Sequence, residues 1–140
     1  MQKILVPIDG SDNSVRACRE ALRMAGGNPA EVHLVNVQPP VLSGYAARFL
    51  NETQIRDYYE SEGRNALRAV EPLPQADGVT YVQRIEVGHP ADTLAAYAKR
   101  RQCDRIVMGT RGLGSLSAAL LGSVATKVIH LAEVPVTLVK

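Results

Sequence analysis

Short apolar runs alternate with segments of helical periodicity along this chain, and this alternation constrains the fold more than any other feature. A helix-like segment lies in each interval between successive runs. Such alternation predicts an α/β fold, in which right-handed crossovers build a doubly wound parallel sheet. Near-continuous apolar character, typical of strands covered on both faces, is found in residues Lys3–Ile8, Val32–Val37, Val79–Val87, Arg105–Met108 and Val136–Val139.

The intervals carry helix start and stop signals. Ser11 or Ser14 can cap a first helix that runs to about Ala25. A long irregular stretch, residues 38–52, follows the second strand. Three further helices are expected: from about Thr53 to Val70, ended by Pro72-Leu73-Pro74; from Gly88-His89-Pro90 onward; and from near Ser123 to about Leu131, with Val124, Val128 and Leu131 along one side.

Composition excludes several classes of protein. A length of 140 residues supports a single domain, 1–140, with a sizeable core. Sixteen basic and fourteen acidic residues leave a net charge of +2, which argues against a nucleic-acid or membrane partner. Neither a membrane span nor a signal peptide is evident. Because Cys18 and Cys103 lie far apart and form no CxxC motif, a cytoplasmic location is expected.

A glycine-rich loop follows the fourth strand, with its signature residues at Gly109, Gly112, Gly122 and Ser123. Glycine lets the backbone turn with positive φ and approach a ligand, and a helix start offers unpaired N–H groups to a phosphate. Ser123 could cap the last helix or donate to a phosphate, and Arg111 and Lys127 are nearby cations. The alternative is that the glycines only shape a tight turn, and the glycines alone do not separate the two.

The spacing Gly109-x2-Gly112-x9-Gly122-Ser123 resembles the ATP-binding signature of the universal stress protein family. Similar stretches run along the whole chain: the opening Ile-Leu-Val-Pro-Ile-Asp-Gly-Ser, the Gly88-His89-Pro90 turn, the run from Asp104 to Gly112, and the closing Val-Pro-Val-Thr-Leu-Val. The resemblance implies a Rossmann-like, adenine nucleotide alpha hydrolase-like domain with strand order 3-2-1-4-5. Nucleotide would lie across the C-terminal ends of strands one and four, at the topological switch point.

The resemblance also implies binding residues and a ligand. Pro7, Asp9 and Val37 would surround adenine and ribose, with Asp9 accepting from a ribose hydroxyl. The phosphates would lie against Gly109, Gly112, Gly122 and Ser123, with Met108, Val124 and Thr126 alongside. The ligand would be ATP, or ADP or AMP, with Mg²⁺ sharing the phosphate charge. The expected function is a nucleotide-dependent switch or sensor in the stress response.

A homodimer is expected through the last strand, Val136–Val139. Pro135 suits an edge strand, and pairing this apolar edge with its symmetry mate would cover it, as the family commonly does. A further protein partner stays open.

The leading alternative is a slow ATPase or nucleotide-processing enzyme on the same fold. No Walker lysine or positioned base is apparent, so no catalytic residue is assigned, although Asp12, His89 or a residue of the 38–52 stretch could close over the γ-phosphate. A phospho-receiver would need an aspartate where Val87-Gly88 stand, and a flavin-binding module should be yellow. Metal binding is not expected, because no ligand-like spacing relates His33, His89 and His130.

Overall fold

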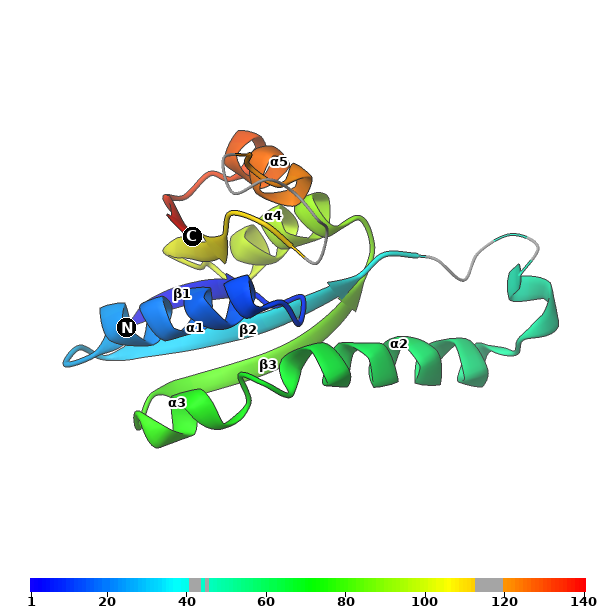
Figure 1. Cartoon of the computed structure of the whole chain (residues 1–140), viewed down its shortest axis with the longest axis horizontal. Helices are drawn as coiled ribbons and strands as arrows, with labels where there is room; N and C mark the ends of the chain where they lie inside the picture. Colours follow the sequence, from blue (N-terminus) through cyan, green and yellow to red (C-terminus); the bar gives the residue numbers. More distant parts are fainter. Residues whose placement is uncertain (41–43, 45, 113–119) are drawn as a thin grey trace.

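The computed structural model describes residues 1–40, 44, 46–112 and 120–140, and these include a parallel sheet of five strands in the order β3-β2-β1-β4-β5 (Figure 1). The predicted doubly wound sheet with order 3-2-1-4-5 is therefore confirmed. The strands are β1 (Gln2–Pro7), β2 (Ala30–Gln38), β3 (Thr80–Val87), β4 (Arg105–Gly109) and β5 (Val136–Val139). The helices are α1 (Asp12–Ala25), α2 (Glu52–Leu67), α3 (Pro72–Ala76), α4 (Pro90–Arg100) and α5 (Ser123–Leu131), with a 3-10 turn η1 (Ala46–Phe49).

Helices cover both faces of the sheet, and the sheet separates the hydrophobic core into two clusters. Ile4 and Val6 of β1 point to the face covered by α1, where α2 and α3 also pack. Leu5, between them, points to the opposite face, where it packs with residues of α4 and α5. Because side chains alternate along a strand, an apolar run such as that of β1 supplies both cores at once.

Ser11 is the residue that caps α1. Its side chain accepts a hydrogen bond from the backbone N–H of Ser14, and Cys18 and Leu22 point into the core below. Of the two caps that the sequence allows, the structure selects the first.

The segment after β2 differs in part from the prediction. The helix α2 ends at Leu67 rather than Val70, and residues Pro72–Ala76, expected only to terminate it, form the short helix α3. Proline suits the first turn of a helix, because the backbone N–H that proline lacks would have no intrahelical acceptor there. The irregular stretch 38–52 contains the 3-10 turn η1.

The buried side of α5 is also not the one predicted. Val128 is buried as expected, but the other buried residue is Ala125, while Val124 is 36% and Leu131 40% exposed. The small Ala125 side chain lets α5 approach the α4 side of the core, which turns the larger Val124 and Leu131 outward.

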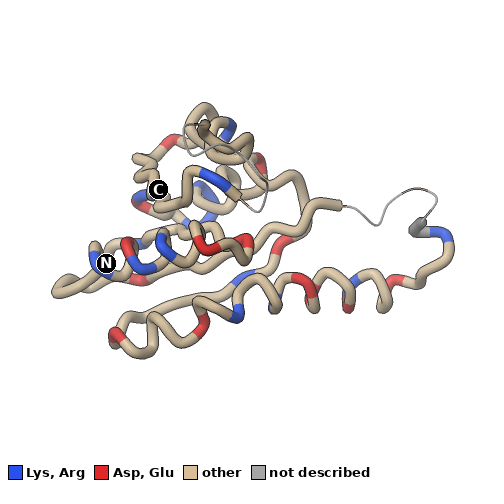
Figure 2. The backbone as a smooth tube through the Cα atoms, viewed as in Figure 1, with Lys and Arg blue, Asp and Glu red and all other residues tan. Residues whose placement is uncertain are grey.

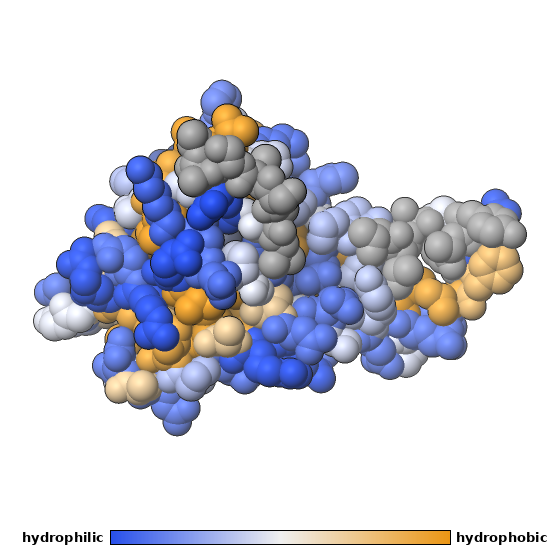
Figure 3. Space-filling model, viewed as in Figure 1, coloured by the Kyte–Doolittle hydropathy of each residue, from blue (hydrophilic) through white to orange (hydrophobic). Residues whose placement is uncertain are grey.

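Charge is dispersed over the molecule. Lysine and arginine are interspersed with aspartate and glutamate along the chain (Figure 2). The face in Figure 3 is largely hydrophilic, with apolar colour in separate places at the top, in the lower left and at the right end of the view. Among the described residues, no helix combines the length and apolar character needed to cross a membrane.

Candidate functional site

The two sides of β1 are paired very differently. With β2, the register runs from Gln2–Ala30 to Pro7–Val35, along the whole of β1. With β4, it covers only Ile4–Arg105 and Leu5–Ile106. The C-terminal ends of β1 and β4 are therefore not paired with each other, and this is the switch point of the sheet, where open α/β folds bind ligands.

Asp9 follows β1 and reaches across this switch point. One carboxylate oxygen, Oδ1, accepts from the backbone N–H of Ser11 at 2.9 Å and also from the Ser11 hydroxyl. The other oxygen, Oδ2, would lie 2.8 Å from a Cβ atom placed on Gly112. Only glycine at position 112 leaves this carboxylate in place, so Asp9 after β1 and the loop after β4 lie directly against each other.

The glycines of the loop serve close approach rather than unusual dihedral angles. Gly109, Gly112 and Gly122 do not have positive φ, so that part of the sequence expectation is wrong. A Cβ on Gly109 would overlap the Asn13 side-chain amide, and one on Gly122 would lie 3.0 Å from the Thr110 carbonyl oxygen. Neighbouring groups occupy the space that a side chain would need.

The start of α5 presents backbone donors beside this loop. Gly122, not Ser123, is the N-cap residue, and its N–H donates to the Thr110 carbonyl at 2.6 Å. Ser123 and Val124 follow as exposed residues of the first turn, where N–H groups have no intrahelical acceptor. Thr126 donates its hydroxyl to the Gly122 carbonyl at 2.9 Å, so this predicted site residue stabilises the helix start.

The two cations proposed for phosphate lie in different surroundings. Arg111 is half-buried in the loop, and its backbone N–H donates to Asn13 Oδ1 at 2.8 Å. Lys127 forms an exposed ion pair with Asp92 of α4, with 3.5 Å between Nζ and Oδ2. Arg111 therefore stays at the candidate site, whereas Lys127 is engaged with α4.

The remaining predicted site residues lie at strand ends. Pro7 ends β1. The buried Met108 side chain belongs to the core on the α4 side, and the half-buried Val37 packs against the same core. These two residues can form the apolar floor of a site at the strand ends. Residues 113–119, between Gly112 and Gly122 of the glycine-rich loop, lie outside the described residues.

Sequence reasoning missed two buried asparagines. Asn13, in the first turn of α1, contacts both Arg111 and β5. Asn36 of β2 donates to the Ile8 carbonyl at 2.8 Å, just before Asp9. The position of Asn36 inside the apolar run of β2 could have indicated a buried hydrogen bond, because a buried amide needs hydrogen-bond partners.

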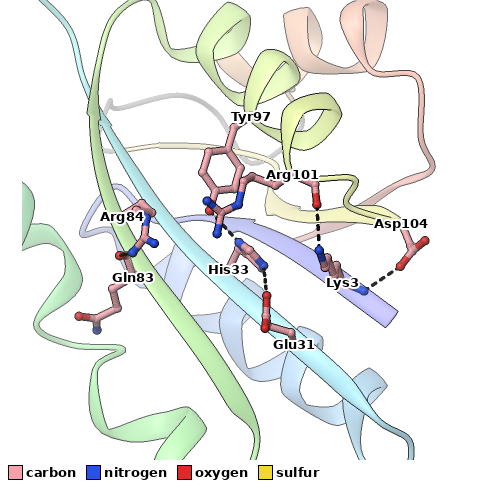
Figure 4. A network of polar contacts seen from close by, with 8 residues as sticks. All are labelled: Lys3, Glu31, His33, Gln83, Arg84, Tyr97, Arg101 and Asp104. Atoms are coloured by element: carbon pink, nitrogen blue, oxygen red, sulfur yellow. Dashed lines mark hydrogen bonds and ion pairs between the residues drawn. The ribbon is translucent and has the colours of Figure 1, made fainter. Parts of the chain in front are cut away.

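A second polar cluster lies under α4, in β1, β2 and β3 (Figure 4). His33 of β2 is fully buried, with Nδ1 2.7 Å from the Tyr97 hydroxyl and Nε2 2.6 Å from Glu31 Oε1. Burial lowers the pKa of His33, outweighing the opposite effect of Glu31. Because an ionised carboxylate only accepts, neutral His33 donates from Nε2 to Glu31, and Tyr97 donates to Nδ1.

Both cysteines are buried. Burial raises the pKa of Cys103, and it raises that of Cys18 to about 11, so both favour the neutral thiol. Within the described part of the chain, no cluster of three or more histidine, cysteine, aspartate or glutamate side chains could hold a metal ion.

Comparison with known proteins identifies the family. The model of the universal stress protein family matches residues 1–140. The universal stress protein MJ0531 of Methanocaldococcus jannaschii is 38% identical over 142 residues, which cover 99% of this chain and 82% of that protein.

Solved structures agree with this fold. The protein MJ0577 superposes with a TM-score of 0.87 at 27% identity, covering 99% of this chain and 95% of the other. A universal stress protein in complex with cAMP has a TM-score of 0.73 at 30% identity, covering 99% and 97%. Because the family model matches the whole sequence and the solved relatives share the fold, this chain belongs to the universal stress protein family.

Proposed function

We propose that this protein binds an adenine nucleotide across the C-terminal ends of β1 and β4, and that residues 1–140 act as one nucleotide-binding domain. Adenine and ribose lie by Pro7, Asp9 and Val37, over the floor that includes Met108. The phosphates lie along the residues of the glycine signature and the start of α5: Gly109, Arg111, Gly112, Gly122, Ser123, Val124 and Thr126.

The approach of Asp9 to Gly112 is the observation that carries this proposal. Asp9 Oδ2 lies where a Gly112 side chain would begin, so a carboxylate oxygen that bonds to no other described residue stands beside the glycine loop. A ribose hydroxyl is a suitable donor for that oxygen. The first-turn amides of α5 and the positive end of its dipole then suit the phosphates that follow the ribose.

The comparisons support an adenine nucleotide in particular. The relative with bound cAMP is 30% identical to this chain over nearly its full length. ATP is the ligand proposed here, because the full glycine signature offers more backbone than a single phosphate needs. Mg²⁺ would share the triphosphate charge and be held by phosphate oxygens and water, in keeping with its preference for retained waters.

A test of the ligand starts from the protein as purified. Mass spectrometry of the nucleotide released on denaturation should detect ATP, ADP or AMP, and calorimetry should rank their affinities against adenosine and cyclic AMP. The variant Gly122→Val should weaken ATP binding at least about tenfold, or about 1.4 kcal/mol, since the valine would meet the Thr110 carbonyl.

Gly26→Val is the matched control, because Gly26 is an exposed glycine with negative φ at the far end of α1. Its ATP affinity should equal that of the wild type, and both variants should keep the native far-ultraviolet circular dichroism. A wild-type protein that binds none of these compounds contradicts the proposal.

The proposed role is that of a stress-response switch or sensor read through its nucleotide state, acting in the cytoplasm as a homodimer. The edge strand β5 supports the dimer: Leu138 is 37% exposed, and Ile129 and Leu131 of α5 are also exposed. Pairing β5 with its symmetry mate would cover apolar surface and an open strand edge together. A further protein partner would read the nucleotide state.

Light scattering tests the dimer. Leu138→Glu should convert a dimer at micromolar concentration into a monomer, because a charge would enter the paired edge. Val87→Glu is the control, since Val87 is an exposed apolar residue at the end of the opposite edge strand, β3. A wild-type monomer at that concentration contradicts this part of the proposal.

A further inference from the structure

We propose that Asn13 is a positioning residue for phosphate binding, which fixes the turn after β4 (Gly109–Gly112) against the last strand of the sheet. The inference rests on the proposed nucleotide site and adds a residue that contacts no nucleotide itself. Asn13 acts through backbone atoms of the turn.

The side chain of Asn13 joins three elements that are far apart in the sequence. Asn13 lies in the first turn of α1 and is 4% exposed. Its Nδ2 donates to the carbonyl of Val139, at the end of β5, over 2.9 Å. Its Oδ1 accepts from the backbone N–H of Arg111, in the turn, over 2.8 Å.

The last strand and the turn are joined a second time at the same point. The Val139 carbonyl also accepts from the backbone N–H of Thr110, over 3.0 Å. Gly109, which precedes Thr110, has no room for a Cβ because the Asn13 amide occupies that space. Asn13 is therefore enclosed by the turn and by β5, and it cannot change rotamer without breaking two hydrogen bonds.

These bonds determine which backbone groups of the turn remain available. The Arg111 N–H is used by Asn13 and so does not serve a ligand, and its bond orients the peptide unit between Thr110 and Arg111. The next residue, Gly112, is the one that lies against Asp9. The Thr110 carbonyl accepts from the N-cap amide of α5, at Gly122. Asn13 thus holds the segment that links Asp9 to the start of α5.

The expected consequence is selective for phosphate. Loss of the Asn13 bonds would leave the Arg111 N–H without its acceptor and the peptide unit between Thr110 and Arg111 less fixed. The carbonyl of that peptide unit is the acceptor of the N-cap amide of α5. Asp9 would keep its own bonds to Ser11, which do not involve the turn. Affinity for ATP should fall while affinity for adenosine is retained.

The variant Asn13→Leu tests this directly, since leucine has a similar shape and neither donates nor accepts. By calorimetry, ATP binding should weaken at least about tenfold, and adenosine binding should change less than about twofold. The matched control is Arg16→Ala. Arg16 lies one turn later in α1, and its Nε donates to the Lys140 carbonyl, over 2.9 Å, without a bond to the turn. Both ligands should bind Arg16→Ala as they bind the wild type.

A second measurement needs no variant. In the wild-type protein without nucleotide, the Arg111 amide should exchange its hydrogen at least roughly 100-fold more slowly than in an unfolded chain, because its acceptor is buried. An Arg111 amide that exchanges at unfolded-chain rates would overturn the inference even if Asn13→Leu does not fold.

The other outcomes separate the two proposals. Equal ATP affinity in Asn13→Leu and wild type overturns the role of Asn13 and leaves the proposed function intact. Equal loss of ATP and adenosine binding also overturns it, because that pattern shows general damage to the site. Failure of the wild type itself to bind ATP and adenosine overturns the proposed function and this inference with it.

Discussion

The two polar regions of the sheet differ in how they use their hydrogen-bonding groups. Under α4, both ring nitrogens of His33 are bonded to side chains, one to Tyr97 and one to Glu31. At the C-terminal ends of β1 and β4, Asp9 uses one oxygen on Ser11 and directs the other toward the glycine loop. The His33 ring is satisfied by neighbouring side chains, whereas Asp9 Oδ2 is bonded to no other described residue.

This difference distinguishes the buried contacts of His33 from the proposed binding site. A buried cluster whose groups satisfy one another stabilises the fold and offers nothing to a ligand. A region built from glycines, a helix start and a carboxylate oxygen with no partner among the described residues is expected to contribute less to stability and more to ligand binding. Substitutions in the two regions should therefore affect different properties.

The largest expected effect is on stability, from His33→Ala. Removing a fully buried ring leaves a cavity, and the Tyr97 hydroxyl loses its hydrogen-bond partner. Together these effects should lower the free energy of unfolding by about 3 kcal/mol. Urea denaturation measures this loss, and Tyr97→Phe should show a smaller one. ATP affinity of the folded variant should stay within about twofold of wild type, and a tenfold loss would place the cluster in the binding site.

The second expected effect is on ligand binding rather than on stability. Asp9→Ala should weaken adenosine and ATP binding alike, at least about tenfold or 1.4 kcal/mol by calorimetry, because Asp9 is proposed to act at the ribose. Gly112→Ala should act in the same direction, because its Cβ would displace Asp9 Oδ2. Asp57→Ala removes an exposed acid from α2 and is the control. Unchanged binding in Asp9→Ala would show that the proposed orientation of the nucleotide is wrong.

The sequence predicts the fold almost completely, because each apolar run is short and bounded by turn residues. The errors come from tertiary contacts that local patterns do not contain. The periodicity of α5 shows an apolar stripe, but which part is buried depends on how closely Ala125 approaches the core. Likewise, α3 is too short to show a helical repeat of apolar residues, and its prolines are equally compatible with the end of the preceding helix.

The candidate site is predictable in its residue types and not in its contacts. The glycine signature indicates a loop that something approaches closely. That Asp9 approaches Gly112, and Asn13 approaches Gly109, depends on β1 and β4 being neighbours in the sheet. A polar residue in the first turn of a helix is ordinarily exposed, so the burial of Asn13 by the end of β5 has no signal in the local sequence.

A third, smaller effect concerns pH. Burial lowers the pKa of His33, so the unfolded chain takes up a proton at a higher pH than the folded protein does. The contribution of neutral His33 to stability is fully present above the unfolded pKa of about 6.5, and it is lost as pH falls toward the lowered folded pKa. Lys3 and Arg101 also lower the pKa, whereas Glu31 raises it.

Urea denaturation between pH 7 and pH 5 should detect this loss, with a slope from His33 of at most about 1.4 kcal/mol per pH unit. His33→Gln should flatten the slope, and His89→Gln, which alters an exposed histidine, should not. A slope that is the same in His33→Gln and wild type would assign the pH dependence to other groups.

The smallest expected effect is on bound ATP itself, which should be hydrolysed at less than about 0.01 s⁻¹, in the range of unassisted nucleotide switches. Fast phosphoryl transfer needs a positioned water and added positive charge. Lys127 is engaged with Asp92, and Asp9 is assigned to the ribose, so the described residues supply backbone donors, Ser123 and Arg111. Donors that stabilise the ground state and the transition state equally increase affinity without increasing rate.

A single-turnover assay with radiolabelled ATP and Mg²⁺ measures the rate, with Gly26→Val as control. Turnover near about 1 s⁻¹ that disappears in Gly122→Val would instead show an enzyme, with Asp12, His89 or a residue of 38–52 completing its site.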